Sequence, residues 1–205
     1  MIFNDGNLKK YKSKNPLKIF MIRNFLSAVE KKFRMIDCDG LKILDAGCGE
    51  GFVTEHLYNC CKKPDIYGVD LSPKAIEYAK KFQNSNINFS IGNVLQLDFE
   101  DKKFDAVCAF EVLEHIPEPE KVLKELFRVS NKYVFLSVPN EPFFCLGNFI
   151  SGKNITRFGN PIDHINHYTL GGFRKFLNKN IPCSKYKLKV YNCLVWSLAV
   201  IEKSE

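Results

Sequence analysis

Short apolar runs alternate with amphipathic stretches through the middle of the chain. Apolar runs of strand length occur at residues 42–46, 65–70, 87–91, 104–110 and 133–138. Apolar residues at helical spacing fill the intervals 51–61, 73–82 and 118–129. Ser72 immediately precedes Pro73, a pair typical of a helix start. This alternation predicts an α/β fold with a doubly wound, mainly parallel sheet.

The two ends of the chain depart from this alternation. Residues 15–34 carry apolar side chains at helical spacing after Pro16, which predicts an N-terminal helix. Residues 139–168 mix Pro, Gly, Asn and Phe, and this composition predicts a substrate or lid loop. Beyond it, we expect a helix over 169–178 capped by Thr169, then an antiparallel hairpin formed by 185–193 and 194–201.

The length of 205 residues suits one domain. Within a single domain spanning 1–205, we expect four parts. These are an N-terminal cap helix region (1–40), a ligand-binding core (41–138), a substrate or lid loop (139–168), and a terminal helix with hairpin (169–205).

Charge is distributed unevenly around a net value of +7. Residues 1–34 hold nine basic and two acidic side chains, and residues 141–205 hold nine and four. Residues 35–140 hold twelve basic and seventeen acidic side chains. Basic ends on an acidic middle favour an anionic partner, although a solvated lysine-rich surface has the same signature.

The cysteines and the apolar runs bear on the compartment. There are eight cysteines but no C-x-x-C pair, and the N-terminus lacks the features of a signal peptide. We therefore expect reduced, mostly buried cysteines in a cytoplasmic protein, with the adjacent Cys60 and Cys61 serving packing. No apolar run approaches the roughly 20 residues that span a bilayer.

A glycine-rich turn follows the first predicted strand. It reads Asp45-Ala-Gly47-Cys48-Gly49-Glu-Gly51, and the third glycine of a dinucleotide fingerprint is replaced by Phe52. Such a turn lets a ligand approach the backbone near a helix N-terminus. Nineteen residues after Gly51, Asp70 ends the second predicted strand, where a carboxylate can accept both ribose hydroxyls of a nucleoside.

These motifs, taken in order, resemble those of class I S-adenosylmethionine-dependent methyltransferases. The similarity is greatest to the small single-domain group that includes the quinone-biosynthesis O-methyltransferases, and it covers residues 41–138. The resemblance implies a Rossmann-like seven-stranded sheet in the order 3-2-1-4-5-7-6 with strand 7 antiparallel. It rests on the glycine turn, Tyr67-Gly-Val-Asp70-Leu-Ser, Gly92-Asn93-Val94, Phe104-Asp-Ala-Val107 and Glu111-Val-Leu-Glu114-His115-Ile.

The resemblance also implies a set of contacts to S-adenosylmethionine. The glycine turn would lie under the methionine part, Asp70 would hold the ribose, and Phe110 would lie beside the sulfonium. The family usually has Asp in place of Asn93, so we expect weaker adenine binding with unchanged chemistry. The implied cofactor residues are Asp45, Gly47, Cys48, Gly49, Gly51, Asp70, Leu71, Asn93, Val94, Phe110 and Glu111.

A second group of residues carries acids and imidazoles. Glu111, Glu114 and His115 have i, i+3, i+4 spacing and would face one side if they form one helical turn. A later segment adds His164, and the arrangement is similar to that of plant-type small-RNA 2′-O-methyltransferases. That similarity implies a divalent metal, Mg²⁺ or Mn²⁺, held by Glu111, Glu114, His115 and His164.

Two alternatives to a metal remain open for this group. His115 can act as a general base, with Glu111 as the second catalytic residue, or the group can have only a structural role. For the acceptor we expect contacts from His164, His167 and Tyr168, with Tyr11 and Arg157 as weaker candidates.

We therefore expect O-methylation of a small or lipid-linked, anionic acceptor. The alternatives are a metal-assisted RNA 2′-O-methyltransferase and a non-catalytic subunit that binds S-adenosylmethionine. A dehydrogenase on a similar sheet is disfavoured by Phe52. The sequence predicts no membrane span and leaves the oligomeric state open.

Overall fold

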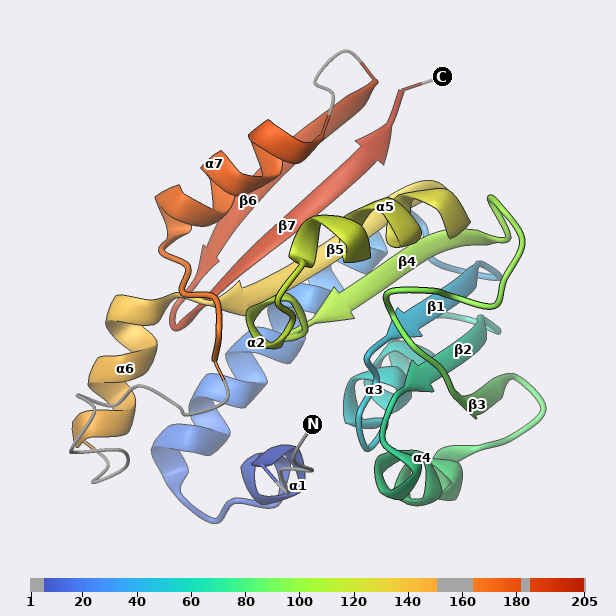
Figure 1. Ribbon diagram of the computed structural model, residues 1–205. Helices are drawn as coiled ribbons and strands as arrows, with labels where there is room; N and C mark the ends of the chain where they lie inside the picture. Colours follow the sequence, from blue (N-terminus) through green and yellow to red (C-terminus); the bar gives the residue numbers. More distant parts are fainter. Residues whose placement is uncertain (1–5, 151–163, 182–184, 205) are drawn as a thin grey trace.

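A seven-stranded sheet in the order β3-β2-β1-β4-β5-β7-β6 forms the centre of the computed structural model, which describes residues 6–150, 164–181 and 185–204 (Figure 1). β1 to β5 pair in parallel, whereas β7 is antiparallel to both β5 and β6. The expected strand order and the antiparallel β7 are confirmed. The strands are β1 (Lys42–Ala46), β2 (Asp65–Asp70), β3 (Ile87–Ile91), β4 (Phe104–Phe110), β5 (Ser130–Pro139), β6 (Tyr186–Cys193) and β7 (Trp196–Lys203).

Helices cover both faces of the sheet because successive strand residues point to opposite sides. Leu44 belongs to the core beneath α5 and α7, whereas its neighbour Ile43 belongs to the core beneath α2 and α3. In Figure 1, α5 and α7 lie in front of the sheet and α2 lies behind it. The helices are α1 (Gly6–Tyr11), α2 (Pro16–Met35), α3 (Phe52–Cys60), α4 (Pro73–Ala79), α5 (Pro119–Val129), α6 (Glu141–Ile150) and α7 (Leu170–Asn180), with 3₁₀ turns η1 (Lys80–Phe82) and η2 (Leu113–His115).

Side-chain caps begin three of these helices. Asn15 accepts hydrogen bonds from the amides of Leu17 and Lys18 at the start of α2. Ser72 accepts from the Ala75 amide before α4, and Thr169 accepts from the Gly172 amide before α7. The Ser72 and Thr169 caps were both expected from the sequence, because a hydroxyl before an amphipathic run satisfies the otherwise unpaired amides of the first turn.

The segment expected to be a loop after β5 starts instead as helix α6. The amides of Phe143 and Phe144 donate to the Asn140 carbonyl, at 3.1 and 3.0 Å, and this starts the helix. The short helix α1 was not predicted from the sequence. Residues 151–163 of the expected lid, including Arg157, lie outside the described residues.

A disulfide joins Cys38 to Cys61, which corrects the expectation that the cysteines are reduced. The two residues are 23 apart in sequence, but their Cα atoms are 5.5 Å apart. The turn after α2 reaches the end of α3, where the Gly40 amide donates to the Lys62 carbonyl at 2.8 Å. This contact between remote segments leaves no sequence signature. Among the described residues, no helix is both long and apolar enough to cross a bilayer.

Candidate active site

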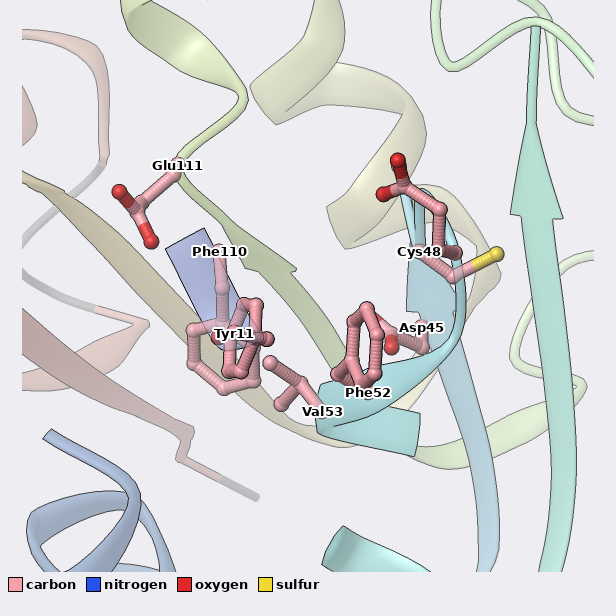
Figure 2. A pocket seen from close by; sticks show the side chains of 9 residues that line it. Tyr11, Asp45, Cys48, Phe52, Val53, Phe110 and Glu111 are labelled. Carbon is pink, nitrogen blue, oxygen red and sulfur yellow. The ribbon is translucent and has the colours of Figure 1, made fainter. Parts of the chain in front are cut away.

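A pocket opens at the carboxyl ends of β1 and β4, the point where the strand order reverses and where ligands bind in open α/β sheets. Its empty volume is about 380 Å³. Figure 2 shows Glu111 toward one end, Asp45 and Cys48 toward the other, and the rings of Tyr11 and Phe52 between them. We call this the β1–β4 pocket; it is lined by Tyr11, Asp45, Gly47, Cys48, Glu50, Phe52, Val53, Phe110 and Glu111.

The glycine turn keeps its shape through backbone that only glycine adopts easily. Gly47, Gly49 and Gly51 have φ of 80°, 53° and 82°. A Cβ on Gly47 would also lie 2.5 Å from Cγ2 of Val112. The amides of Gly47 and Cys48 donate to the Val69 carbonyl at 2.7 and 2.9 Å, so β2 holds the turn in place.

Asp45 is a buried carboxylate beneath this turn. Its Oδ2 accepts a hydrogen bond from Thr54 Oγ1 at 2.6 Å. Burial raises the pKa of Asp45 to about 6, and the charge of Asp70 adds to the rise, while the Thr54 hydroxyl opposes it. A cation bound in the pocket would reverse this shift and stabilise the ionised form.

Asp70 fixes the approach of the turn to β2. Its carboxylate accepts from the Gly49 amide at 2.9 Å and from the Ser72 amide at 2.8 Å. One oxygen is used by each amide, and a carboxylate has about four lone-pair sites, so two remain for a ligand.

The residues expected on the adenine side follow β2 and β3. Leu71 is 49% exposed, as an unpaired apolar side chain at a binding edge would be. Asn93 Oδ1 accepts from the Leu95 amide at 3.0 Å, which shapes the turn after β3. Val94 is buried in the core beside Leu44 and Leu97.

Glu111 leaves the end of β4 in a left-handed conformation, with φ of 58°. Its carboxylate pairs with the Lys10 ammonium of α1. Burial pushes the pKa of Glu111 up, but the Lys10 ammonium outweighs it and holds that pKa below its usual range. The condition that residues 111–116 form one helical turn is therefore not met, because Glu111 has a positive φ and the turn η2 covers only Leu113–His115.

Helix α1 brings Tyr11 into the pocket lining and Lys10 against Glu111, which also lines the pocket. Lys10 Nζ lies 4.8 Å from the centroid of the Trp196 ring, in addition to its pairing with Glu111. The Tyr11 ring stacks on Phe52 with centroids 4.8 Å apart. Tyr11 was a weak sequence candidate and Lys10 was missed, since a single lysine in a lysine-rich stretch carries no distinguishing signal.

A group of one acid and two imidazoles lies beyond Glu111, and we call it the acid–imidazole cluster. Glu114, His115 and His164 each place one potential ligand atom within 4.8 Å of the others. Glu114 is only 1% exposed, and neither of its carboxyl oxygens has a hydrogen-bond partner among the described residues. Burial, and next the charge of Glu111, raise the pKa of Glu114 well above its ordinary value.

Backbone hydrogen bonds bring the two remote halves of the acid–imidazole cluster together. The amides of Ile165 and Asn166 donate to the Glu114 carbonyl at 2.8 and 3.0 Å. The Asn166 side-chain amide donates to the carbonyls of Leu113 and Ile116 at 3.0 and 2.6 Å. The segment that carries His164 is therefore clamped onto η2.

Glu141, at the start of α6, was not among the predicted site residues. Its Oε1 lies 2.9 Å from Nδ1 of His164 and 3.5 Å from Nδ1 of His167. Burial pushes the pKa of Glu141 up, but the hydrogen bonds from His164 and Cys145 outweigh it and hold that pKa below its usual range. The sequence offers one indication of Glu141: it lies two residues beyond the end of β5. We had assigned residues 139–168 to a substrate or lid loop and did not single out this carboxylate.

The residues predicted to contact the acceptor differ in how far they are buried. His164 is buried in the acid–imidazole cluster, whereas the His167 side chain is 47% exposed. Tyr168 is buried in the core under α7, with its ring centroid 5.6 Å from those of Phe173 and Phe176. Three of the four predicted metal ligands thus lie together, and Glu111 is engaged by Lys10 instead.

Comparison with known proteins identifies the family to which the central part of the chain is similar. Residues 44–136 match the family model described as methyltransferase domain. Residues 44–136 form a class I S-adenosylmethionine-dependent methyltransferase domain. The chain is 27% identical to the mitochondrial ubiquinone biosynthesis O-methyltransferase of Dictyostelium discoideum over 168 residues, which is 72% of this chain and 52% of that protein.

Solved methyltransferases share the fold. Magnesium protoporphyrin IX methyltransferase from Synechocystis PCC 6803, solved with bound SAH, superposes with a TM-score of 0.71 at 17% identity, covering 98% of this chain and 96% of that one. The methyltransferase domain of bacterial CtHen1-C gives a TM-score of 0.67 at 24% identity, covering 90% and 100%. At such identities the likeness concerns the fold. The chain spans about half the length of the curated relatives it matches.

Proposed function

We propose that this methyltransferase domain transfers the methyl group of S-adenosylmethionine to an oxygen of a small or lipid-linked, anionic acceptor. The observation that carries the proposal is the position of the acid–imidazole cluster. Glu111 lines the β1–β4 pocket, and Glu114 and His115 follow it in the next turn of the chain. A group able to take a proton from a hydroxyl therefore adjoins the pocket of the methyl donor.

The pocket suits the methyl donor in shape and charge. The glycine turn offers close backbone approach for the methionine part, and Asp45 supplies a negative group for a cation. Asp70 keeps two lone-pair sites for ribose hydroxyls. When bound, S-adenosylmethionine supplies a methyl group on a leaving group that is already activated.

The protein's part in such a reaction is alignment and proton removal. His115 is the proposed base, because it lies in the turn that follows the pocket and its side chain carries a nitrogen that can accept a proton. Glu111 is proposed to orient the reacting groups near the sulfonium, through its ion pair with Lys10.

A divalent metal is a second candidate for activating the hydroxyl, and the residues fit one. The fit rests on Glu114, whose two buried oxygens have no partner among the described residues. With His115 and His164 it makes a set of one carboxylate and two imidazoles, which suits Zn²⁺, Fe²⁺ or Mn²⁺ better than Mg²⁺. Such an ion would be held by these three residues and would lower the pKa of a bound hydroxyl.

Two lines of support bear on the acceptor. The relatives from Dictyostelium discoideum and Coxiella burnetii are named for O-methylation in ubiquinone biosynthesis, which supports an oxygen on a small molecule, although a sterol 24-C-methyltransferase from Aspergillus fumigatus also matches. The basic ends of the chain, on either side of an acidic middle, favour an anionic acceptor. An RNA end remains the alternative, supported by the acid–imidazole cluster.

Methyl transfer from radiolabelled S-adenosylmethionine to matched catechols tests the proposal. We expect the anionic 3,4-dihydroxybenzoate to be methylated faster than neutral catechol, with the preference shrinking as salt rises. His115→Ala should lose turnover while cofactor affinity stays unchanged. An exposed substitution, Glu77→Gln on α4, is the matched control.

Three results would contradict parts of the proposal. Cofactor binding without label transfer to any hydroxyl would indicate a non-catalytic subunit. Faster transfer to the neutral catechol at all salt concentrations would show that the basic ends are only solvated surface. Transfer to a short RNA with a steep salt dependence would favour the RNA alternative.

A further inference from the structure

Glu141 lies at the junction of β5 and α6, on the side of the sheet where the acid–imidazole cluster forms. Its own amide donates to the Tyr168 carbonyl at 2.9 Å, so its backbone is tied to the segment that carries the histidines. Its side chain is 10% exposed. The backbone from which the carboxylate extends is therefore held in place, and the carboxylate has little contact with solvent.

Both oxygens of this carboxylate have assigned partners. Oε1 lies 2.9 Å from His164 Nδ1, and Oε2 accepts from Cys145 Sγ at 2.9 Å. Since an ionised carboxylate only accepts hydrogen bonds, the proton in the His164 contact must lie on Nδ1. The nitrogen left to His164 for any other partner is then Nε2.

The His164 ring is held from several directions. Its side chain is 6% exposed, and it stacks on Phe144 with centroids 5.6 Å apart and an interplanar angle of 25°. It meets the His115 ring edge to face, with centroids 5.1 Å apart. A ring packed in this way cannot easily rotate to exchange its two nitrogens.

We propose that Glu141 is a positioning residue that fixes the orientation and the Nδ1–H tautomer of His164, so that the Nε2 lone pair is presented to the acid–imidazole cluster. The inference rests on the proposed function of that cluster and extends it. A carboxylate that holds the second nitrogen of a functional histidine fixes the tautomer and the orientation of the ring. His167 shares Oε1 of Glu141 at a longer 3.5 Å and is half exposed, so it is peripheral to this role.

Two substitutions of similar size separate acceptor chemistry from packing. Glu141→Leu removes the acceptor, and Glu141→Gln keeps an oxygen that can accept from Nδ1. Cys145→Ala is the control, because it removes the partner of Glu141 Oε2 and leaves Oε1, the oxygen that contacts His164, in place.

The first readout is the imidazole tautomer, measured by long-range ¹H–¹⁵N spectra of the metal-free protein, with His164→Gln to assign the signals. We expect Nδ1–H at His164 in the wild type, in Glu141→Gln and in Cys145→Ala, and a shift to Nε2–H in Glu141→Leu. An Nδ1–H tautomer that persists in Glu141→Leu would overturn the inference. Should Glu141→Leu not fold, Glu141→Ala replaces it with the same expectations.

The second readout is turnover. Glu141→Leu should lower kcat by about 10- to 100-fold, the range found when such supporting partners are removed. KM for S-adenosylmethionine should stay unchanged, and Glu141→Gln should recover most of the loss. An unchanged kcat in Glu141→Leu would overturn the inference. If the wild type is inactive but Glu141→Leu shows the expected tautomer shift, only the proposed function is refuted.

Discussion

Replacing the buried carboxyl of Glu114 by an amide should stabilise the metal-free protein. Glu114 is 1% exposed, and neither oxygen has a hydrogen-bond partner among the described residues. A buried polar group without a partner costs about 1–3 kcal/mol, and a charged one costs more. Glu114→Gln keeps a buried polar group but cannot ionise, so its expected gain in the free energy of unfolding at pH 8 is about 1.4 kcal/mol for each unit by which the pKa of Glu114 is raised.

The sign of the pH dependence follows from the direction of the pKa shift. The pKa of Glu114 is raised in the folded protein by burial and then by Glu111. Its contribution to stability is therefore complete below the ordinary Glu pKa of about 4.3 and is lost as pH rises through the higher folded value. The advantage of Glu114→Gln should be absent at pH 4 and grow toward pH 8.

Urea unfolding in the presence of a chelator, repeated from pH 4 to pH 8, measures this difference. In thermal unfolding of the same proteins, each kcal/mol would correspond to a shift of about 2–4 °C in Tm for a chain of this size. Glu77→Gln, an exposed change, should stay within about 0.5 kcal/mol of wild type at every pH. A Glu114→Gln protein that is less stable than wild type at pH 8, or a difference that does not vary with pH, would refute the reasoning.

The same pair of proteins separates the two candidate roles of the acid–imidazole cluster. A metal bound by the folded wild type adds stability by mass action, about 2.7 kcal/mol at 100 times its Kd. Adding Mn²⁺ or Zn²⁺ should then raise the stability of wild type and leave Glu114→Gln unchanged. If both ions change the stability of the two proteins equally, the cluster does not bind a metal through Glu114, and His115 acting as a base without metal is the role that remains.

Three further changes test other parts of the structure. Asp70→Ala should weaken S-adenosylmethionine binding by about 1.5–3 kcal/mol in calorimetry, through lost charge-assisted hydrogen bonds, and equal affinity would remove Asp70 from the ribose site. Gly68→Ala would place a Cβ 2.5 Å from Phe89, so urea unfolding should show a loss of about 1–3 kcal/mol, and wild-type stability would mean that the ring moves freely. Lys10→Gln removes the partner of Glu111 and should speed chymotrypsin cleavage after Tyr11, whereas the exposed change Lys124→Gln should not.

Local patterns were sufficient to predict the first four strands of the sheet. The runs at 42–46, 65–70, 87–91 and 104–110 match β1 to β4 in their bounds, because buried parallel strands are short, apolar and separated by helices. The Ser72 and Thr169 caps were readable for the same reason, since a cap is set by residues within one turn. The strand order itself came from the family resemblance.

Features that depend on contacts between remote segments could not be read in advance. The spacing of Glu111, Glu114 and His115 suggested one helical face, but Glu111 adopts a positive φ and turns to Lys10, 101 residues away. Similarly, Cys38 and Cys61 pair because two turns meet in space. A helical spacing rule holds only where the backbone is helical, and a strand end is where that condition fails.

The positions of these remote contacts bear on where acceptor specificity resides. Residues 44–136, which match the family model, contain the glycine turn, Asp70 and η2. Tyr11, which lines the pocket, and His164, which belongs to the acid–imidazole cluster, lie outside that range, and so do their neighbours Lys10 and Glu141. Under the proposed function, these segments would face the acceptor, and they lie outside the part of the chain that the family model describes. We therefore expect relatives to keep the core and to differ in acceptor through changes in α1, in α6 and in the segment that carries His164.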